Sequence, residues 1–203
     1  NSDILSSTEE YNGSSWASSS TLIFARCYPQ GSGDNISTAF LNGGSTTAGE
    51  YIASSNTQQY NGTAWSISAN SSIVRTRGLA AGNSTNGLIA GGCNTPQAPT
   101  FTVATEEYNY GTACIGAWSS GANATITAKR ELHFGKVGTQ NATLLISGYV
   151  TPGGVTTCTE EYDGTSWTAG GTNITPRYVG GNTGTQDAAL FVGGNLVTST
   201  HSN

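Results

Sequence analysis

Paired acidic residues are the part of this sequence that comes nearest to catalytic machinery. Three such pairs and one amide pair recur along the chain: Glu9-Glu10, Glu106-Glu107, Glu160-Glu161 and Gln58-Gln59. Two carboxylates that share a pocket can act as acid and base in glycoside hydrolysis. Adjacent residues on a strand point to opposite faces of the sheet, so the two members of one pair cannot share a pocket. We therefore predict a structural role for the pairs and no catalytic residue.

An arginine stands 16 residues after the second member of the pair in two copies. These are Glu10 with Arg26 and Glu161 with Arg177, and Gln59 with Arg75 keeps the same spacing. The spacing predicts a repeated Glu–Arg contact that joins neighbouring repeats. Burial of such a charge requires its partner, so loss of one side is expected to cost several kcal/mol.

The sequence lacks the residues that a metal site or a nucleophilic catalytic site needs. The two histidines, His133 and His201, lie in different contexts, whereas a zinc or copper site takes several His or Cys ligands at close spacing. The sequence shows no Ser-His-Asp arrangement, phosphate-binding glycine loop or Cys-x-x-Cys pair. We therefore predict no metal site, no cofactor and no enzymatic activity.

A pattern repeated four times predicts the elements that hold these residues. The copies occupy residues 8–16, 57–65, 105–118 and 159–167, and the third copy carries an insertion. In the other three, a tyrosine ends one strand, Asn-Gly or Asp-Gly makes the turn and a tryptophan anchors the next strand. Asn-Gly and Asp-Gly accept the positive φ angles of two-residue hairpin turns, so each copy predicts a β-hairpin.

A second kind of hairpin runs from an arginine through an apolar strand to a glycine pair, which is degenerate at Gly148-Tyr149. Its copies are Arg26 to Gly43-Gly44, Arg75 to Gly91-Gly92, Arg130 to Gly148, and Arg177 to Gly193-Gly194. Four short strands in about 50 residues are typical of a propeller blade. We predict an all-β, four-bladed β-propeller forming a single domain over residues 1–203. The repeat units are residues 26–67, 75–120, 130–169, and 177–203 with 1–18.

The two ends of the chain hold complementary halves of a repeat unit. The chain begins with a Tyr–Trp hairpin and ends with an arginine hairpin. We expect the N-terminal hairpin to complete the last blade and close the ring, which would pair strand edges that otherwise invite aggregation. The alternative is that the same halves pair between neighbouring chains and build a filament.

The order Arg, apolar strand, Gly-Gly, Tyr, Trp resembles the kelch repeat of galactose-oxidase-like propellers. The wording Thr-Glu-Glu-Tyr-(Asn/Asp)-Gly-Thr-Ser-Trp, with Gly-Thr-Gln-(Asn/Asp)-Ala at residues 138–142 and 184–188, is similar to kelch-like repeats of bacteriophage structural proteins. The resemblance covers essentially the whole chain. It implies a kelch-like propeller, and it says little of activity because propellers host many functions. The two histidines, two tyrosines and Tyr–Cys crosslink of a galactose-oxidase copper site are not supplied in matching motifs.

The repeated aromatic and arginine residues are predicted to be structural. They are Tyr11, Trp16, Arg26, Tyr60, Trp65, Arg75, Tyr108, Trp118, Arg130, Tyr162, Trp167 and Arg177. The tryptophans and tyrosines could form a sugar-stacking platform, but their regular place in every repeat favours packing between blades. The insertion at residues 109–116 and the loop at residues 94–99 are the candidates for a contact site, because specificity in repeat proteins tends to lie in such insertions.

The four cysteines, Cys27, Cys93, Cys114 and Cys158, are disulfide candidates with three possible pairings. In an up-and-down blade, Cys114 falls at the opposite end from the other three, which argues against Cys93–Cys114. The other pairings stay open. Among them we predict Cys93–Cys158, with buried free thiols as the alternative.

Asn-x-Ser/Thr sequons mark eight glycosylation candidates: Asn12, Asn35, Asn61, Asn70, Asn83, Asn123, Asn141 and Asn173. All of them fall in predicted turns or in connections between blades. Exposed turns are what N-glycosylation needs if the chain is exported. Turns favour asparagine in any case, and a phage protein made in bacteria would normally carry no such sugars.

The charge and hydropathy of the chain exclude two classes of partner, nucleic acids and membranes. The net charge is −5 without a basic stripe, so we expect no nucleic-acid binding. No apolar stretch reaches the roughly 18 residues of a membrane span, so we expect no membrane insertion. We predict a non-enzymatic structural or adhesive module of an extracellular filament or virion fibre, which self-associates into a fibre or larger particle. The alternative is a carbohydrate-binding propeller that takes glycans as ligands.

Overall fold

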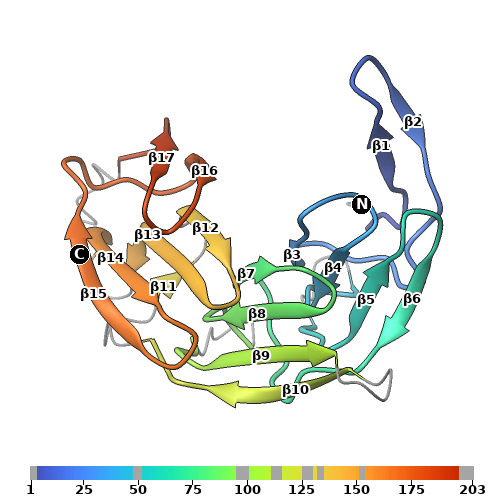
Figure 1. Ribbon diagram of the computed structural model, residues 1–203, viewed down its shortest axis with the longest axis horizontal. Coiled ribbons are helices and arrows are strands. Elements are labelled where there is room, and N and C mark those ends of the chain that lie inside the picture. Colours follow the sequence, from blue (N-terminus) through green and yellow to red (C-terminus); the bar gives the residue numbers. More distant parts are fainter. Residues whose placement is uncertain are drawn as a thin grey trace.

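The computed structural model of the protein describes residues 4–47, 52–94, 101–110, 116–124, 130–131, 135–150 and 154–196. These residues form seventeen β-strands and their connecting turns, without an α-helix (Figure 1). The strands make up five antiparallel sheets. No apolar helix long enough to cross a membrane occurs in the described ranges.

Three of the sheets are complete blades. The first blade contains β3 (Gln30–Ser32), β4 (Ala39–Asn42), β5 (Thr57–Tyr60) and β6 (Trp65–Ser68). The second blade contains β7 (Leu79–Gly82), β8 (Asn86–Ala90), β9 (Thr105–Tyr110) and β10 (Gly116–Gly121). The third blade contains β12 (Gly135–Thr139), β13 (Ala142–Val150), β14 (Gly154–Tyr162) and β15 (Trp167–Thr172), and β11 (Arg130–Glu131) pairs with the far end of β13.

Two hairpins carry the strands of a fourth blade. The N-terminal hairpin pairs β1 (Glu9–Tyr11) with β2 (Trp16–Ser18), and the C-terminal hairpin pairs β16 (Gly181–Gly184) with β17 (Ala189–Val192). This architecture confirms the predicted all-β, four-bladed propeller-like fold. The expected closure within one chain is not formed, because the two hairpins are separate two-stranded sheets at opposite ends of an open arc (Figure 1).

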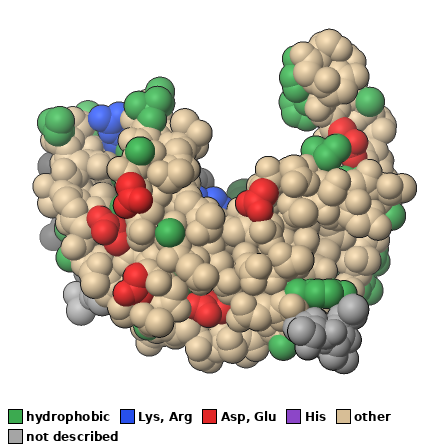
Figure 2. Space-filling model, viewed as in Figure 1, with side chains coloured by type: hydrophobic (Ala, Val, Ile, Leu, Met, Phe, Trp, Pro, Cys, Tyr) green, Lys and Arg blue, Asp and Glu red, His purple; other side chains and the backbone are tan. Residues whose placement is uncertain are grey.

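The inner strands set the order of the blades around the arc. β3 packs against β7, β7 against β12, and β12 against β16. The N-terminal hairpin stands beside the outer strands of the first blade (Figure 1). The space-filling view shows the resulting hollow between two arms, one ending in each hairpin (Figure 2).

The Asn-Gly and Asp-Gly hairpins form as the sequence predicts. The Asp163 carboxylate accepts the backbone N–H groups of Ser166 and Thr165 at 2.8 Å each. These bonds, that of Ser166 above all, lower the pKa of Asp163 to about 2. Gly164 takes a φ of 93°, a left-handed conformation that residues with a side chain rarely adopt. The turn then places the rings of Tyr162 and Trp167 at 5.0 Å between centroids.

Apolar residues are buried where two complete blades face each other. Leu88 of β8 is fully buried in a cluster with Leu145, Tyr162 and Trp167 of the third blade. Phe40 of the first blade forms a second cluster with residues of the second blade. The strand β17 has no such cover, and its Leu190 is 59% exposed. Burial in this fold therefore depends on a neighbouring blade.

This dependence predicts different costs for one substitution at two equivalent positions. Leu88 and Leu190 each stand three residues before the first glycine of a Gly-Gly pair. Leu88→Ala should lower the free energy of unfolding by about 2–5 kcal/mol, since it leaves a buried cavity. Leu190→Ala should stay within about 0.5 kcal/mol in dilute solution. Urea denaturation measures both, and equal losses would contradict the assignment of the core.

Candidate functional site

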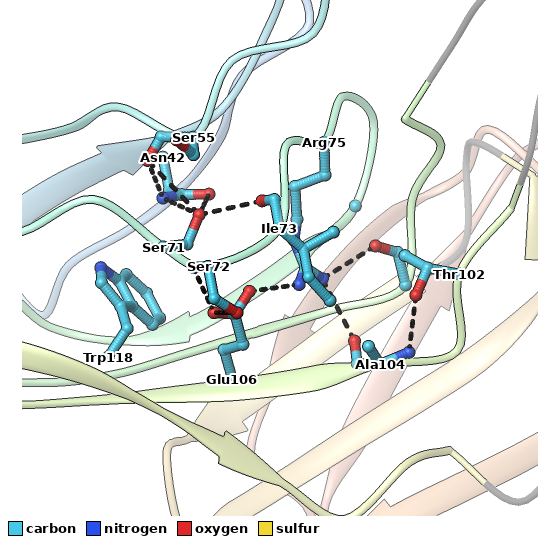
Figure 3. A network of polar contacts seen from close by, with 12 residues as sticks. Asn42, Ser55, Ser71, Ser72, Ile73, Arg75, Thr102, Ala104, Glu106 and Trp118 are labelled. Atoms are coloured by element: carbon cyan, nitrogen blue, oxygen red, sulfur yellow. Dashed lines mark hydrogen bonds and ion pairs between the residues drawn. The ribbon is translucent and has the colours of Figure 1, made fainter.

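Arg75 and Glu106 form a buried ion pair inside the second blade (Figure 3). Arg75 Nη2 donates to Glu106 Oε2 at 2.5 Å, and the two side chains are 0% and 2% exposed. The other carboxylate oxygen accepts the backbone N–H of Ser72 at 2.6 Å and its hydroxyl at 2.7 Å. Burial lowers the pKa of the Arg75 guanidinium, and the charge of Glu106 opposes that shift. The buried pair has a structural role, because it joins the segment that holds Ser72 and Arg75 to strand β9.

The same guanidinium also binds two carbonyl groups, and this arrangement recurs. Arg75 Nη1 donates to Gly91 O at 3.0 Å and to Ala104 O at 3.1 Å, which ties the start of the blade to the end of β8 and the start of β9. Arg26 does the same in the first blade, with bonds of 2.7 Å to Gly43 O and 3.1 Å to Asn56 O. Arg177 makes the first of these bonds, 3.1 Å to Gly193 O.

The predicted Glu–Arg contact at a spacing of 16 residues is wrong in its partners. Glu10 does not meet Arg26. Its carboxylate accepts the hydroxyl of Tyr60 in the first blade and that of Ser19 at 2.7 Å, and these bonds lower the pKa of Glu10. The arginine partner is instead the first acid of the pair, in the same blade, as in Arg75–Glu106.

The second acid of the pair joins one blade to the next. Glu107 of the second blade accepts the hydroxyl of Tyr162 in the third blade, just as Glu10 accepts that of Tyr60. Burial first, and the bond to Glu107 second, raise the pKa of Tyr162. Alternation along the strand thus sends Glu106 toward its own blade's arginine and Glu107 toward the following blade.

Two of the tryptophans, Trp118 and Trp167, make a parallel contact in the same direction. Trp167 Nε1 of the third blade donates to Thr105 Oγ1 of the second at 2.9 Å. Trp118 Nε1 of the second blade donates to Thr57 Oγ1 of the first at 3.1 Å. These indoles are packed between blades, whereas Trp16 of the N-terminal hairpin is 67% exposed.

The Gly-Thr-Gln segments have a docking role that sequence reasoning missed. Gln140 Nε2 donates to the carbonyls of Gly87 and Tyr108 in the second blade, at 3.2 Å each. Gln186 Nε2 of the C-terminal hairpin donates to the carbonyls of Thr143 and Tyr162 in the third blade, at 3.2 and 2.9 Å. The repetition of the Gly-Thr-Gln sequence in two blades could have indicated this role. Each glutamine seats its hairpin on the preceding blade.

An open groove lies between the third blade and the C-terminal hairpin, with a volume of about 420 Å³. We name it the blade-4 groove. Its lining includes Thr159, Glu161, Ile174, Arg177 and Phe191. Of these, Ile174 is 101% exposed. The groove therefore combines a carboxylate, a guanidinium and an exposed apolar side chain. On β17, Leu190 and Val192 are 59% and 55% exposed but do not line the groove.

The predicted sequons are placed on or near the surface. Asn12, Asn35, Asn61, Asn70, Asn123 and Asn141 are exposed, whereas Asn83 and Asn173 are half-buried. The amide nitrogen of Asn83 donates to Asp34 Oδ2 at 2.6 Å, and that of Asn173 donates to Ser147 Oγ at 2.6 Å. Glycosylation at these two positions would have to break a hydrogen bond.

The predicted Cys93–Cys158 disulfide is wrong. Cys27 and Cys93 are free thiols, and the buried Cys93 Sγ lies 3.2 Å from Thr76 Oγ1. The positions 111–115 with Cys114, the loop 95–100, His133, His201 and the side chain of Arg130 lie outside the described residues. Among the residues that are described, no three His, Cys, Asp or Glu side chains gather in a way that could hold a metal ion.

Lys136 on the inner strand β12 spans the arc. Its Nζ donates to Gly31 O of β3, in the first blade, at 3.3 Å. Burial lowers the pKa of this ammonium group to about 8. The bond links two blades that are not neighbours along the chain.

The comparisons with known proteins give information on the fold alone. No protein-family model matches the chain, and no curated protein matches it. Among solved structures, the chain is similar to one described as the structure of YjhT, with a TM-score of 0.75 at 12% identity. The match covers 95% of this chain and 69% of that chain. At this identity the likeness shows a shared propeller-like fold and nothing of activity.

The buried ion pair predicts a large cost for losing one charge. Glu106→Gln leaves the Arg75 guanidinium without a counter-charge, so the free energy of unfolding should fall by about 3 kcal/mol or more. Glu9→Gln changes the equivalent residue of the N-terminal hairpin, which is exposed, and should cost less than about 0.5 kcal/mol in dilute solution. Urea denaturation at neutral pH compares the two, and a loss below about 1 kcal/mol for Glu106→Gln would contradict this structural role.

The low pKa of Lys136 predicts a dependence of stability on pH. The folded state holds this proton less tightly than the unfolded state, whose pKa is near 10.5. Stability should therefore rise as the pH increases from about 8 to 10.5, and fall again on return to 8. Lys136→Met should flatten this part of the curve, as followed by thermal unfolding. An unchanged slope in the variant would rule out Lys136 as its source.

Proposed function

We propose that this chain is a non-enzymatic structural or adhesive module that self-associates, as part of an extracellular filament or a virion fibre. The observation that carries the proposal is the pair of hairpins at the two ends of the arc. Among the described residues, no further strand pairs with the outer edge of β17. An open strand edge is a ready template for another chain, and most proteins cover or charge it.

Exposed apolar and aromatic side chains at both hairpins support association. Leu190 and Val192 are 59% and 55% exposed on β17, and Trp16 and Tyr11 are 67% and 51% exposed on the other hairpin. Hydrophobic side chains are visible at the ends of both arms (Figure 2). Charged residues make up only 9% of the chain, so little electrostatic repulsion opposes contact between copies.

The module is further assigned to a virion fibre, and export of the chain would allow N-glycosylation of its exposed asparagines. The kelch-like wording of the repeats and its similarity to bacteriophage structural proteins favour a virion fibre. Exposed sequon asparagines such as Asn12, Asn61 and Asn70 would allow N-glycans if the chain is exported from a eukaryotic cell. An intact mass of the isolated protein tests the sugars directly.

A carbohydrate-binding role is the second candidate, favoured by one observation. The rings of Tyr11 and Trp16 lie 5.3 Å apart on the exposed hairpin, where a sugar ring could stack. Trp16→Ala should then abolish a signal on a glycan array. A signal that survives Trp16→Ala, or no signal in the unaltered protein, removes this candidate.

Self-association is tested by its dependence on concentration. Sedimentation velocity should show the protein growing beyond the monomer at micromolar concentrations, and negative-stain images should show fibres or larger particles. Leu190→Lys places a charge on the open edge and should suppress this growth. Ile67→Lys, at a residue of β6 that is 60% exposed, is the matched control and should leave it intact. A monomer at every concentration, or equal effects of the two variants, would contradict the proposal.

A further inference from the structure

We infer that the blade-4 groove binds the N-terminal hairpin of a second copy of this chain, with β1 of that copy pairing beside β17. The inference rests on the proposed self-association and specifies its surface. In the complete blades, a Tyr–Trp hairpin pairs with an arginine hairpin and packs on the preceding blade.

The complete blades share one register. The tyrosine that ends the third strand faces Ala39 in the first blade, Gly87 in the second and Thr143 in the third. Each of these residues stands four positions before Gly43, Gly91 or Ser147, which follow the apolar strand. The corresponding position before Gly193 is Ala189. The register therefore places Tyr11 of the second copy opposite Ala189, and Thr8 opposite Val192.

This register brings an acid to the arginine of the groove. In the second blade, Arg75 binds the carbonyl of Ala104 and the carboxylate of Glu106, which lie one residue before and one residue after Thr105. The residues in those positions around Thr8 are Ser7 and Glu9. Arg177 already holds Gly193 O and, within the described part of the chain, has no second carbonyl partner. Ser7 O and the Glu9 carboxylate of the second copy supply the two missing acceptors.

The backbone shortly before Arg177 offers a second donor to the same carboxylate. Glu106 accepts the N–H of Ser72, which stands seven residues after Trp65 of the preceding blade. Gln58 accepts the N–H of Ile23, seven residues after Trp16, at 2.7 Å. Seven residues after Trp167 stands Ile174, which is 101% exposed. The Ile174 N–H is therefore the second donor for Glu9.

The wall of the groove offers the acceptors that the hairpin needs. Tyr162 and Trp167 of the third blade bind Glu107 and Thr105 of the second. The same positions of the third blade are Glu161 and Thr159, and both line the groove. The hydroxyl of Tyr11 and the indole N–H of Trp16 are thus matched by Glu161 and Thr159.

One face of the N-terminal hairpin is free for this contact. Glu10 points toward the first blade of its own chain, where it binds Tyr60. Glu9 and Tyr11 point to the opposite side, since they are the neighbours of Glu10 along the strand. Glu9, Tyr11 and Trp16 are all exposed. The hairpin can therefore stay on its own first blade while it fills the groove of another copy.

A second copy is the occupant because the chain's own hairpin lies at the other end of the open arc (Figure 1). Among the strand contacts, β16 packs against β12 and makes no comparable contact with β3, which would be its neighbour in a closed ring. The hairpin and the groove are different surfaces, so the contact is head-to-tail. Such contacts repeat into a larger ring or an open filament.

The pairing of Glu9 with Arg177 is tested by exchanging their charges between copies. Glu9→Arg and Arg177→Glu each place like charges together at every contact, so each variant alone should self-associate more than about tenfold more weakly. In an equimolar mixture, the arginine introduced at position 9 of one variant meets the glutamate introduced at position 177 of the other. The native Glu9 and Arg177 meet at the next contact. The mixture should therefore regain the association of the unaltered protein in sedimentation velocity, with circular dichroism showing that both variants fold.

The other outcomes separate this inference from the proposed function. If the single variants associate as the unaltered protein does, another surface is used, and the inference falls while self-association stands. If the variants lose thermal stability that only the double variant in one chain regains, and the mixture does not, the hairpin closes within its own chain and the inference is overturned. If the unaltered protein is monomeric at every concentration, the inference and the proposed function both fall.

Discussion

Polar contacts hold the third blade on the second. The Tyr162 hydroxyl donates to Glu107 and the Trp167 indole N–H donates to Thr105. Tyr60 bonds to Glu10 and Trp118 bonds to Thr57 in the same direction, whereas the Tyr108 hydroxyl bonds to Ser68 Oγ. Buried polar atoms need such partners, because an unsatisfied donor or acceptor costs about 1–3 kcal/mol. At this contact the third blade supplies the donors and the second blade supplies the acceptors.

The two ends of the arc follow from this polarity. The third blade presents an acceptor face with Glu161 and Thr159 in an open groove, and the N-terminal hairpin presents a donor face with Tyr11 and Trp16. The ion pair Arg75–Glu106 works inside one blade and fixes where its third strand begins. The proposed self-association depends on these two unmatched faces, where polar and apolar groups are exposed.

Local sequence predicts the periodic part of this structure well. The Asn-Gly and Asp-Gly turns, the four-stranded unit and the propeller-like fold are confirmed, because each depends on residues close together along the chain. The partner of Glu10 was missed because spacing along the chain suggested Arg26, whereas strand alternation sends Glu10 toward Tyr60. Closure of the ring is not shown, since the two terminal hairpins are separate sheets. Closure depends on the angle between blades, which no short stretch of sequence encodes.

The interaction between blades is tested most directly by a double-mutant cycle on Tyr162 and Glu107. Tyr162→Phe, Glu107→Gln and the double variant would each be unfolded in urea, and the coupling energy taken from the three changes in the free energy of unfolding. A hydrogen bond to a charged group that joins two blades predicts a coupling of about 1.5–3 kcal/mol. Additive effects, within about 0.5 kcal/mol, would show that the blades are held together in some other way.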